Sequence, residues 1–193
     1  MRESLRSNIA SHLDLSGGEI DSFCSLFHPR EIKKKCCLLK KGEICKFEAL
    51  VVKGMFRVYH IDSRGAEQIL YFALENWWIS DIDSFTNEKT SEFCIEAIED
   101  STVLVISKAD KEFAYKSMPK IEKLFRIITQ KNQVALERRL IDTLSKTAHE
   151  RYIDFTEKFP KHYQKISNLH IASYLGISRE FLSKIRSKIT LEK

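Results

Sequence analysis

The spacing of hydrophobic residues changes twice along this chain of 193 residues. Over residues 1–30, apolar positions recur at helical intervals, which predicts short helices. From about 31 to 107, apolar and polar residues alternate in short runs near Gly42, Gly54 and Gly65, which is typical of strands joined by turns. From 108 onward the helical period returns. The pattern therefore predicts a β domain between helical segments.

The middle stretch contains four strand patterns. Residues 56–61 alternate, 62–65 have turn composition, and 67–73 form a second run. Two further runs cover 93–98 and 102–106. Short strands separated by glycine-containing turns predict an antiparallel sandwich or barrel.

A long helix is predicted behind Pro119, because no Gly or Pro interrupts residues 120–145. It would extend on the order of 35 to 40 Å. Its apolar stripe must be covered, either by this chain or by coiled-coil pairing with a second copy. We favour pairing, because the rest of the chain is too small to cover the whole stripe. The residues assigned to this dimer interface are Ile121, Leu124, Phe125, Ile128 and Ala135.

Charge is distributed unevenly. Residues 1–110 hold 14 Lys and Arg against 18 Asp and Glu, whereas residues 111–193 hold 18 against 9. A basic C-terminal part within a chain of net charge +5 is compatible with a polyanionic partner, although a basic face is often only solvated.

The most informative segment is 166–188. Ser167 is placed to cap a helix ending at Leu175, Gly176 suits a left-handed turn, and Ser178 can cap a second helix. In that second helix Leu182 and Ile185 share one face and polar residues occupy the other. This pattern predicts a helix-turn-helix unit.

The polar face of the second helix suits the major groove, where Arg can bind guanine and Glu can accept from cytosine. The alternative is an ordinary helical hairpin with a solvated face. The residues expected to contact DNA are Ser178, Arg179, Glu180, Ser183, Lys184, Arg186, Ser187 and Lys188.

Taken together, the β-rich front, the long helix and the segment 176–185 resemble the Crp/Fnr family of bacterial transcription regulators. In that family Arg179, Glu180 and Lys184 would correspond to the base-reading positions. The family usually has Arg at the position of Lys184. Arg can form two parallel hydrogen bonds to a base, whereas the Lys ammonium acts as a point charge. The resemblance implies an α+β fold: an N-terminal antiparallel β-roll (jelly roll), a long central dimerisation helix and a C-terminal helix-turn-helix. The expected divisions are 1–110 for a cyclic-nucleotide-binding-like sensor domain, 111–146 for the dimerisation helix region and 147–193 for the DNA-binding domain.

The resemblance also implies a ligand pocket, with Trp77, Trp78, Ser80, Asp81 and Ser91 as candidates. Cyclic AMP binders carry a Gly-Glu pair and then an Arg. Here the pair is Ser80-Asp81, and residues 90–93 contain no Arg. A buried phosphate would lack compensation, so we expect no cyclic AMP binding in the usual mode.

The expected function is a dimeric transcription regulator of palindromic DNA. Its partners would be double-stranded DNA, a second copy and RNA polymerase, with any small-molecule effector unknown. The N-terminus has no signal-peptide h-region, so a cytoplasmic protein without membrane contact is expected. Only four residues follow Ile189, where the family has a wing, so a reduced DNA-binding unit is expected. The competing class is a cyclic-nucleotide or small-ligand sensing module that acts through protein contacts.

Other chemistry is weighed and set aside. The five cysteines lack CxxC spacing and the clustered pattern of iron–sulfur members, so they are interpreted as reduced thiols. Gly54, His60, Asp62 and Glu67 approach a metal-binding cupin motif, but the second motif is missing. We therefore expect no metal, no cofactor and no enzymatic activity.

Overall fold

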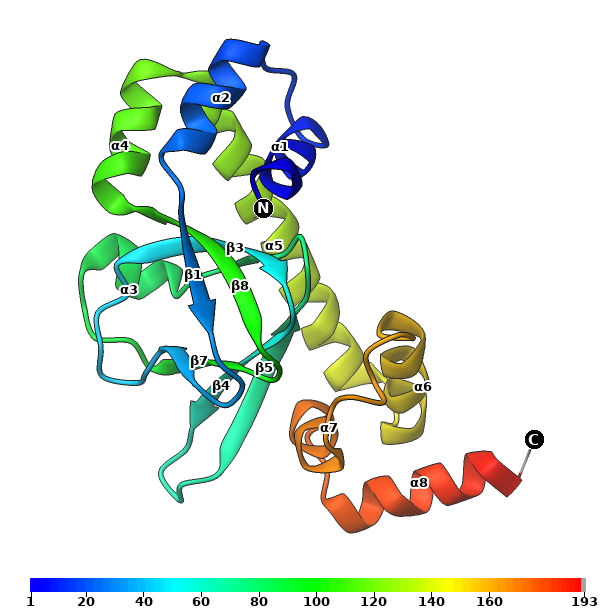
Figure 1. Cartoon of the computed structure of the whole chain (residues 1–193). Coiled ribbons are helices and arrows are strands. Elements are labelled where there is room, and N and C mark those ends of the chain that lie inside the picture. The colour runs from blue at the N-terminus through cyan, green and yellow to red at the C-terminus, as the bar shows by residue number, and fades with distance from the viewer. Residues whose placement is uncertain (192–193) are drawn as a thin grey trace.

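The computed structural model describes residues 1–191 and places two helices, a β-roll and a series of C-terminal helices in that order (Figure 1). The N-terminal helices are α1 (Arg2–Ala10) and α2 (Gly17–Ser25). The strands are β1 (His28–Ile32), β2 (Cys37–Leu39), β3 (Phe47–Lys53), β4 (Phe56–Ile61), β5 (Glu67–Ala73), β6 (Trp78–Ile79), β7 (Phe93–Ala97) and β8 (Ser101–Ser107). The remaining helices are α3 (Ile82–Asn87), α4 (Lys108–Ser117), α5 (Lys120–Ser145), α6 (Ala148–Lys158), α7 (Asn168–Leu175) and α8 (Arg179–Leu191).

The eight strands form two four-stranded sheets whose neighbouring strands pair antiparallel. Their orders are β1-β8-β3-β6 and β2-β7-β4-β5. Phe47, Val58 and Ile95 belong to the apolar core that the sheets share. The predicted β-roll is confirmed, and so is the hairpin of β4 and β5. In its turn Gly65 has φ 82°, and the Asp62 carboxylate accepts from the amides of Arg64 and Ala66.

Helix α5 crosses the whole molecule, from the N-terminal helices past β5 to α6 (Figure 1). Its first half is buried in a second core with Phe23 of α2. There the Phe125 ring contacts the rings of Phe23 and Trp78 edge-on. Its second half exposes large apolar side chains. These are Val134, Leu136, Leu140, Ile141 and Leu144.

A third core joins the last three helices to the β-roll. Phe72 of β5 contacts the rings of Phe155, Phe159 and Tyr174. Tyr59 and Ile69 lie in the same core as the buried residues of α7 and α8. The sheet containing β4 and β5 is therefore covered on both faces.

Among the described helices none has the length and apolar character needed to cross a membrane.

Candidate nucleic-acid interface

Helices α7 and α8 form the predicted helix-turn-helix, with the predicted caps. Ser167 accepts from the amide of His170 and Ser178 from that of Phe181. Gly176 has φ 67°, and the Ile177 amide donates to the carbonyl of Ala172 at 3.0 Å. This bond from the residue after the left-handed one is the Schellman closure of a helix end. The turn is thus encoded locally.

Helix α8 has one buried face and one exposed face. Leu182 and Ile185 are 1% and 6% exposed and pack into the third core. Every residue that the sequence assigned to DNA contact is exposed. These are Ser178, Arg179, Glu180, Ser183, Lys184, Arg186, Ser187 and Lys188.

The exposed face carries more positive than negative charge, with Glu180 as its acidic residue. The backbone amide of Glu180 itself, the Ser178 hydroxyl and nearby Arg179 lower the pKa of the Glu180 carboxyl, so it is ionised at neutral pH. Arg186 donates to the side-chain oxygen of Asn168 at the start of α7. The face thus presents one hydrogen-bond-accepting carboxylate among several cations, the kind of surface that binds duplex DNA.

Helix α7 is anchored to the β-roll through polar contacts as well as apolar ones. Ser173 bonds to the backbone of β5, and Arg139 of α5 donates to the carbonyls of Ile69 and Tyr174 at 2.9 and 3.0 Å. The Arg139 guanidinium also lies 4.2 Å from the Tyr174 ring centroid. Long helix, sheet edge and helix-turn-helix therefore meet at one junction.

A buried ion-pair cluster lies on β4 near this junction. Arg57 pairs with Glu67 and with Glu96. Burial lowers the pKa of Arg57, but hydrogen bonds to Glu67 and Glu96 outweigh it and leave the pKa raised. Burial and nearby Arg57 lower the pKa of His170 on α7.

The five ligand-pocket candidates do not line one cavity. Trp78 points into the second core, where its indole donates to Asn8. Trp77 is 36% exposed, with the Lys158 ammonium 5.8 Å from its ring centroid. Ser80, Asp81 and Ser91 are neighbours inside the β-roll, with Ser91 donating to the Asp81 carboxylate at 2.7 Å.

Asp81 serves as a structural cap. Its buried carboxylate accepts from the amide of Ser84 at the start of α3 as well as from Ser91. Burial and the Asp81 charge raise the pKa of Tyr71, which packs in the same core. Asp81 is therefore a buried carboxylate whose hydrogen bonds are made within the β-roll.

Four of the five dimer-interface candidates are covered by this chain itself. Ile121, Leu124, Phe125 and Ile128 are at most 7% exposed and pack in the second core. Ala135 is exposed on the second half of α5. The sequence analysis did not assign the neighbouring exposed apolar side chains to the interface, although it placed all of them except Val134 on the apolar stripe; they are Val134, Leu136, Leu140, Ile141 and Leu144. Their period continues the buried stripe, so only the fold shows where intrachain cover ends.

The five cysteines are free thiols, and within the described residues no group of three or more His, Cys, Asp or Glu side chains is placed to hold a metal ion. His60 contacts the carbonyl of Glu92 and Asp62 caps the hairpin turn. These two residues of the cupin-like pattern therefore have structural partners.

Comparison with known proteins agrees with this architecture. Residues 29–116 match the family described as cyclic nucleotide-binding domain. No curated protein matches the chain significantly.

Solved structures share this fold over most of the chain. FixK2 from Bradyrhizobium japonicum has a TM-score of 0.76 at 21% identity, covering 86% of this chain and 85% of its own. The c-di-GMP responsive global regulator CLP from Xanthomonas campestris has a TM-score of 0.75 at 14% identity, covering 92% and 93%. A protein from Eubacterium rectale assigned to the Crp/Fnr family of regulators has a TM-score of 0.69 at 18% identity, covering 93% and 85%. The predicted fold class is confirmed.

Proposed function

We propose that this chain is a DNA-binding transcription regulator. Residues 29–116 match the cyclic nucleotide-binding domain family, and the chain has the fold of Crp/Fnr regulators. It binds palindromic DNA as a homodimer in the cytoplasm and has no catalytic role. RNA polymerase is its further protein partner. The regulators among the solved structures support this class.

The proposal rests on one observation: helix α8 has one buried apolar face and one exposed polar face. Leu182 and Ile185 hold the helix to its own domain, and the side chains expected to bind DNA all remain exposed. Arg179 and Lys184 would read bases, and Arg186 and Lys188 would contact phosphates.

Dimerisation is proposed through the second half of α5. A second copy of the same stripe would bury the exposed residues 134–144 in coiled-coil fashion. The two α8 helices would then contact successive major grooves about 34 Å apart, which requires a nearly palindromic site.

We propose further that cyclic AMP does not bind in the usual mode. The Asp81 carboxylate is buried, bonded to Ser91 and Ser84, and would repel a phosphate. Isothermal titration with cyclic AMP should give no heat of binding at micromolar concentration. A micromolar affinity would contradict this part of the proposal.

The function is tested by selection from random duplex DNA with the purified chain. Enrichment of a palindrome with half-sites one helical turn apart is expected. If no sequence is enriched, the alternative is favoured, in which the β-roll is a sensing module that acts through protein contacts.

A further inference from the structure

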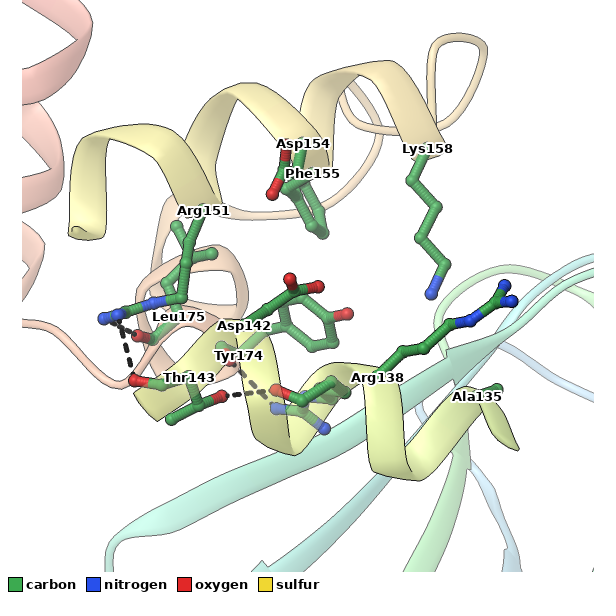
Figure 2. Close-up of a pocket in the computed structure, with 11 residues that line it drawn as sticks. Ala135, Arg138, Asp142, Thr143, Arg151, Asp154, Phe155, Lys158, Tyr174 and Leu175 are labelled. Atoms are coloured by element: carbon green, nitrogen blue, oxygen red, sulfur yellow. Dashed lines mark hydrogen bonds between the residues drawn. The ribbon is translucent and has the colours of Figure 1, made fainter. Parts of the chain in front are cut away.

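A cavity of about 250 Å³ lies where α5, α6 and α7 meet (Figure 2). We call it the hinge pocket. Its lining residues are Ala135, Arg138, Arg139, Asp142, Thr143, Arg151, Asp154, Phe155, Lys158, Tyr174 and Leu175. It is separate from both the β-roll interior and the exposed face of α8.

The pocket contains four cations and two carboxylates, and the carboxylates are already paired. Lys146, outside the lining, binds Asp142 at 2.9 Å and Asp154 at 2.7 Å. Within residues 1–191, none of the four lining cations has a carboxylate oxygen within 4.0 Å. The hinge pocket therefore has uncompensated positive charge.

Two of these cations are half-buried and bond only to neutral oxygens. Arg139 donates to the carbonyls of Ile69 and Tyr174. Arg151 donates to carbonyls of Lys146 and Leu175, and its buried Nε has no hydrogen-bond partner. Unpaired cations out of water are unfavourable unless an anion accompanies them.

The other two cations converge at the exposed rim. Figure 2 shows Arg138 of α5 and Lys158 of α6 pointing toward one another. Burial and nearby Arg139 lower the pKa of Lys158, as expected among like charges. An anion held between Arg138 and Lys158 would also offset the repulsion between Lys158 and Arg139.

We propose that the hinge pocket binds a small polyanion, a phosphate ester or a polycarboxylate. The volume is below the usual range for drug-sized ligands, so the ligand must be compact. Arg138 and Lys158 bind its charged groups from the rim, and Arg151 Nε offers a further donor. The side chains of Phe155 and Tyr174 contact its less polar part.

The pocket's position gives the anion a role, on the basis of the proposed function. An anion bridging α5 and α6 would fix the angle between the long helix and the DNA-binding helices. Because that angle sets the spacing of two α8 helices in a dimer, binding would change operator affinity.

Binding is measured by calorimetry on the full chain with pyrophosphate and, separately, citrate, against sodium chloride of equal ionic strength. We expect saturable binding of at least one anion. Binding of pyrophosphate would indicate a phosphate ligand, and binding of citrate a polycarboxylate ligand. R138Q and K158Q should each weaken binding tenfold or more, because each removes a rim cation while Arg139 keeps its structural bonds. K116Q, an exposed lysine on α4, should not. Absence of binding, or unchanged affinity in both rim variants, would overturn the site.

The regulatory role is measured with the operator obtained by selection. The binding anion should change operator affinity at least fivefold in the parent chain and not in K158Q. If calorimetry shows binding but operator affinity stays constant, the regulatory role is wrong and the site stands. If no operator is enriched, the regulatory role fails together with the proposed function, while calorimetry still decides the site.

Discussion

The hydroxyl of Ser173 donates a hydrogen bond of 2.6 Å to the backbone carbonyl of Glu67, 106 residues away in the sequence. It also accepts from the Ile69 amide at 3.0 Å. Strand β5 is at the edge of its sheet, so these backbone groups have no neighbouring strand on that side. One side chain of the helix-turn-helix thus completes the hydrogen bonding of a strand in the β-roll, and any rotation of that unit must break both bonds.

Replacing Ser173 with Ala should therefore weaken this junction. The variant leaves two backbone groups without their partner, which costs about 1 to 3 kcal/mol of unfolding free energy. Urea denaturation measures the loss, and hydrogen exchange at the Ile69 amide should accelerate. S187A is the control, because its hydroxyl bonds only within α8, and its effect should stay within about 0.5 kcal/mol. Equal effects in the two variants would contradict the proposed bridge.

The turn between α7 and α8 should depend on backbone conformation alone. At Gly176 a Cβ would meet no atom within 4 Å, but φ is 67°. We expect G176A to lose about 1 to 2 kcal/mol of unfolding free energy, and G176N to lose less, because Asn tolerates the left-handed region better. G17A, at an equally open position without positive φ, should not destabilise the chain. If G176A and G176N lose the same amount, conformational strain is not the cause.

Stability should fall in mild acid through His170. Its folded pKa lies below the usual 6.5, because burial and nearby Arg57 disfavour the imidazolium, although Glu67 and Glu96 oppose this. Between the two pKa values the unfolded chain binds more protons than the folded chain. This contribution is therefore complete above about pH 6.5 and decreases as pH falls toward the folded pKa. Urea titrations between pH 7.5 and 5 should show a smaller decrease for H170Q than for the parent. The same decrease in both would contradict this assignment.

Local signals in the sequence predicted much of the recognition unit. Ser167, Gly176 and Ser178 define the boundaries of α7 and α8 through bonds to residues at most five positions away, so the sequence alone contains that information. The hairpin turn at Asp62 is encoded in the same way.

Features that depend on distant partners were not predictable in this way. Periodicity shows that Ile121 and Leu140 lie on an apolar stripe, but it does not say what covers each. In the fold, Ile121 is buried in the second core, whereas Leu140 stays 59% exposed. The cations of the hinge pocket come together only because three helices meet. Tyr59 and Ile69 are buried on the outer face of a sheet only because α7 packs against β5 there.

The exposed half of α5 should hold the dimer together. L140E would place a charge in the proposed interface and should raise the dimer dissociation constant at least tenfold, because an unpaired carboxylate would be buried there. Sedimentation equilibrium measures this, and operator affinity should fall with dimerisation. F113E, at a residue of α4 with similar exposure, is the control and should leave both unchanged. A parent chain that is monomeric at tens of micromolar would contradict the proposed interface.

Replacing Arg179 and replacing Lys188 should have different effects on DNA binding. Arg179 lies in the first turn of α8, the part of a recognition helix that enters the major groove. R179A should cost about 1 to 3 kcal/mol of operator binding and relax specificity at one base pair, because a bidentate contact to guanine is lost. Lys188, about two and a half turns further along the helix, would contact phosphate. K188A should therefore weaken binding to operator and random DNA alike and reduce the slope of log affinity against log salt by about one unit. Fluorescence anisotropy with the selected operator, its single-base variants and random duplex separates the two effects. If R179A leaves both affinity and base preference unchanged, the exposed face of α8 does not read DNA.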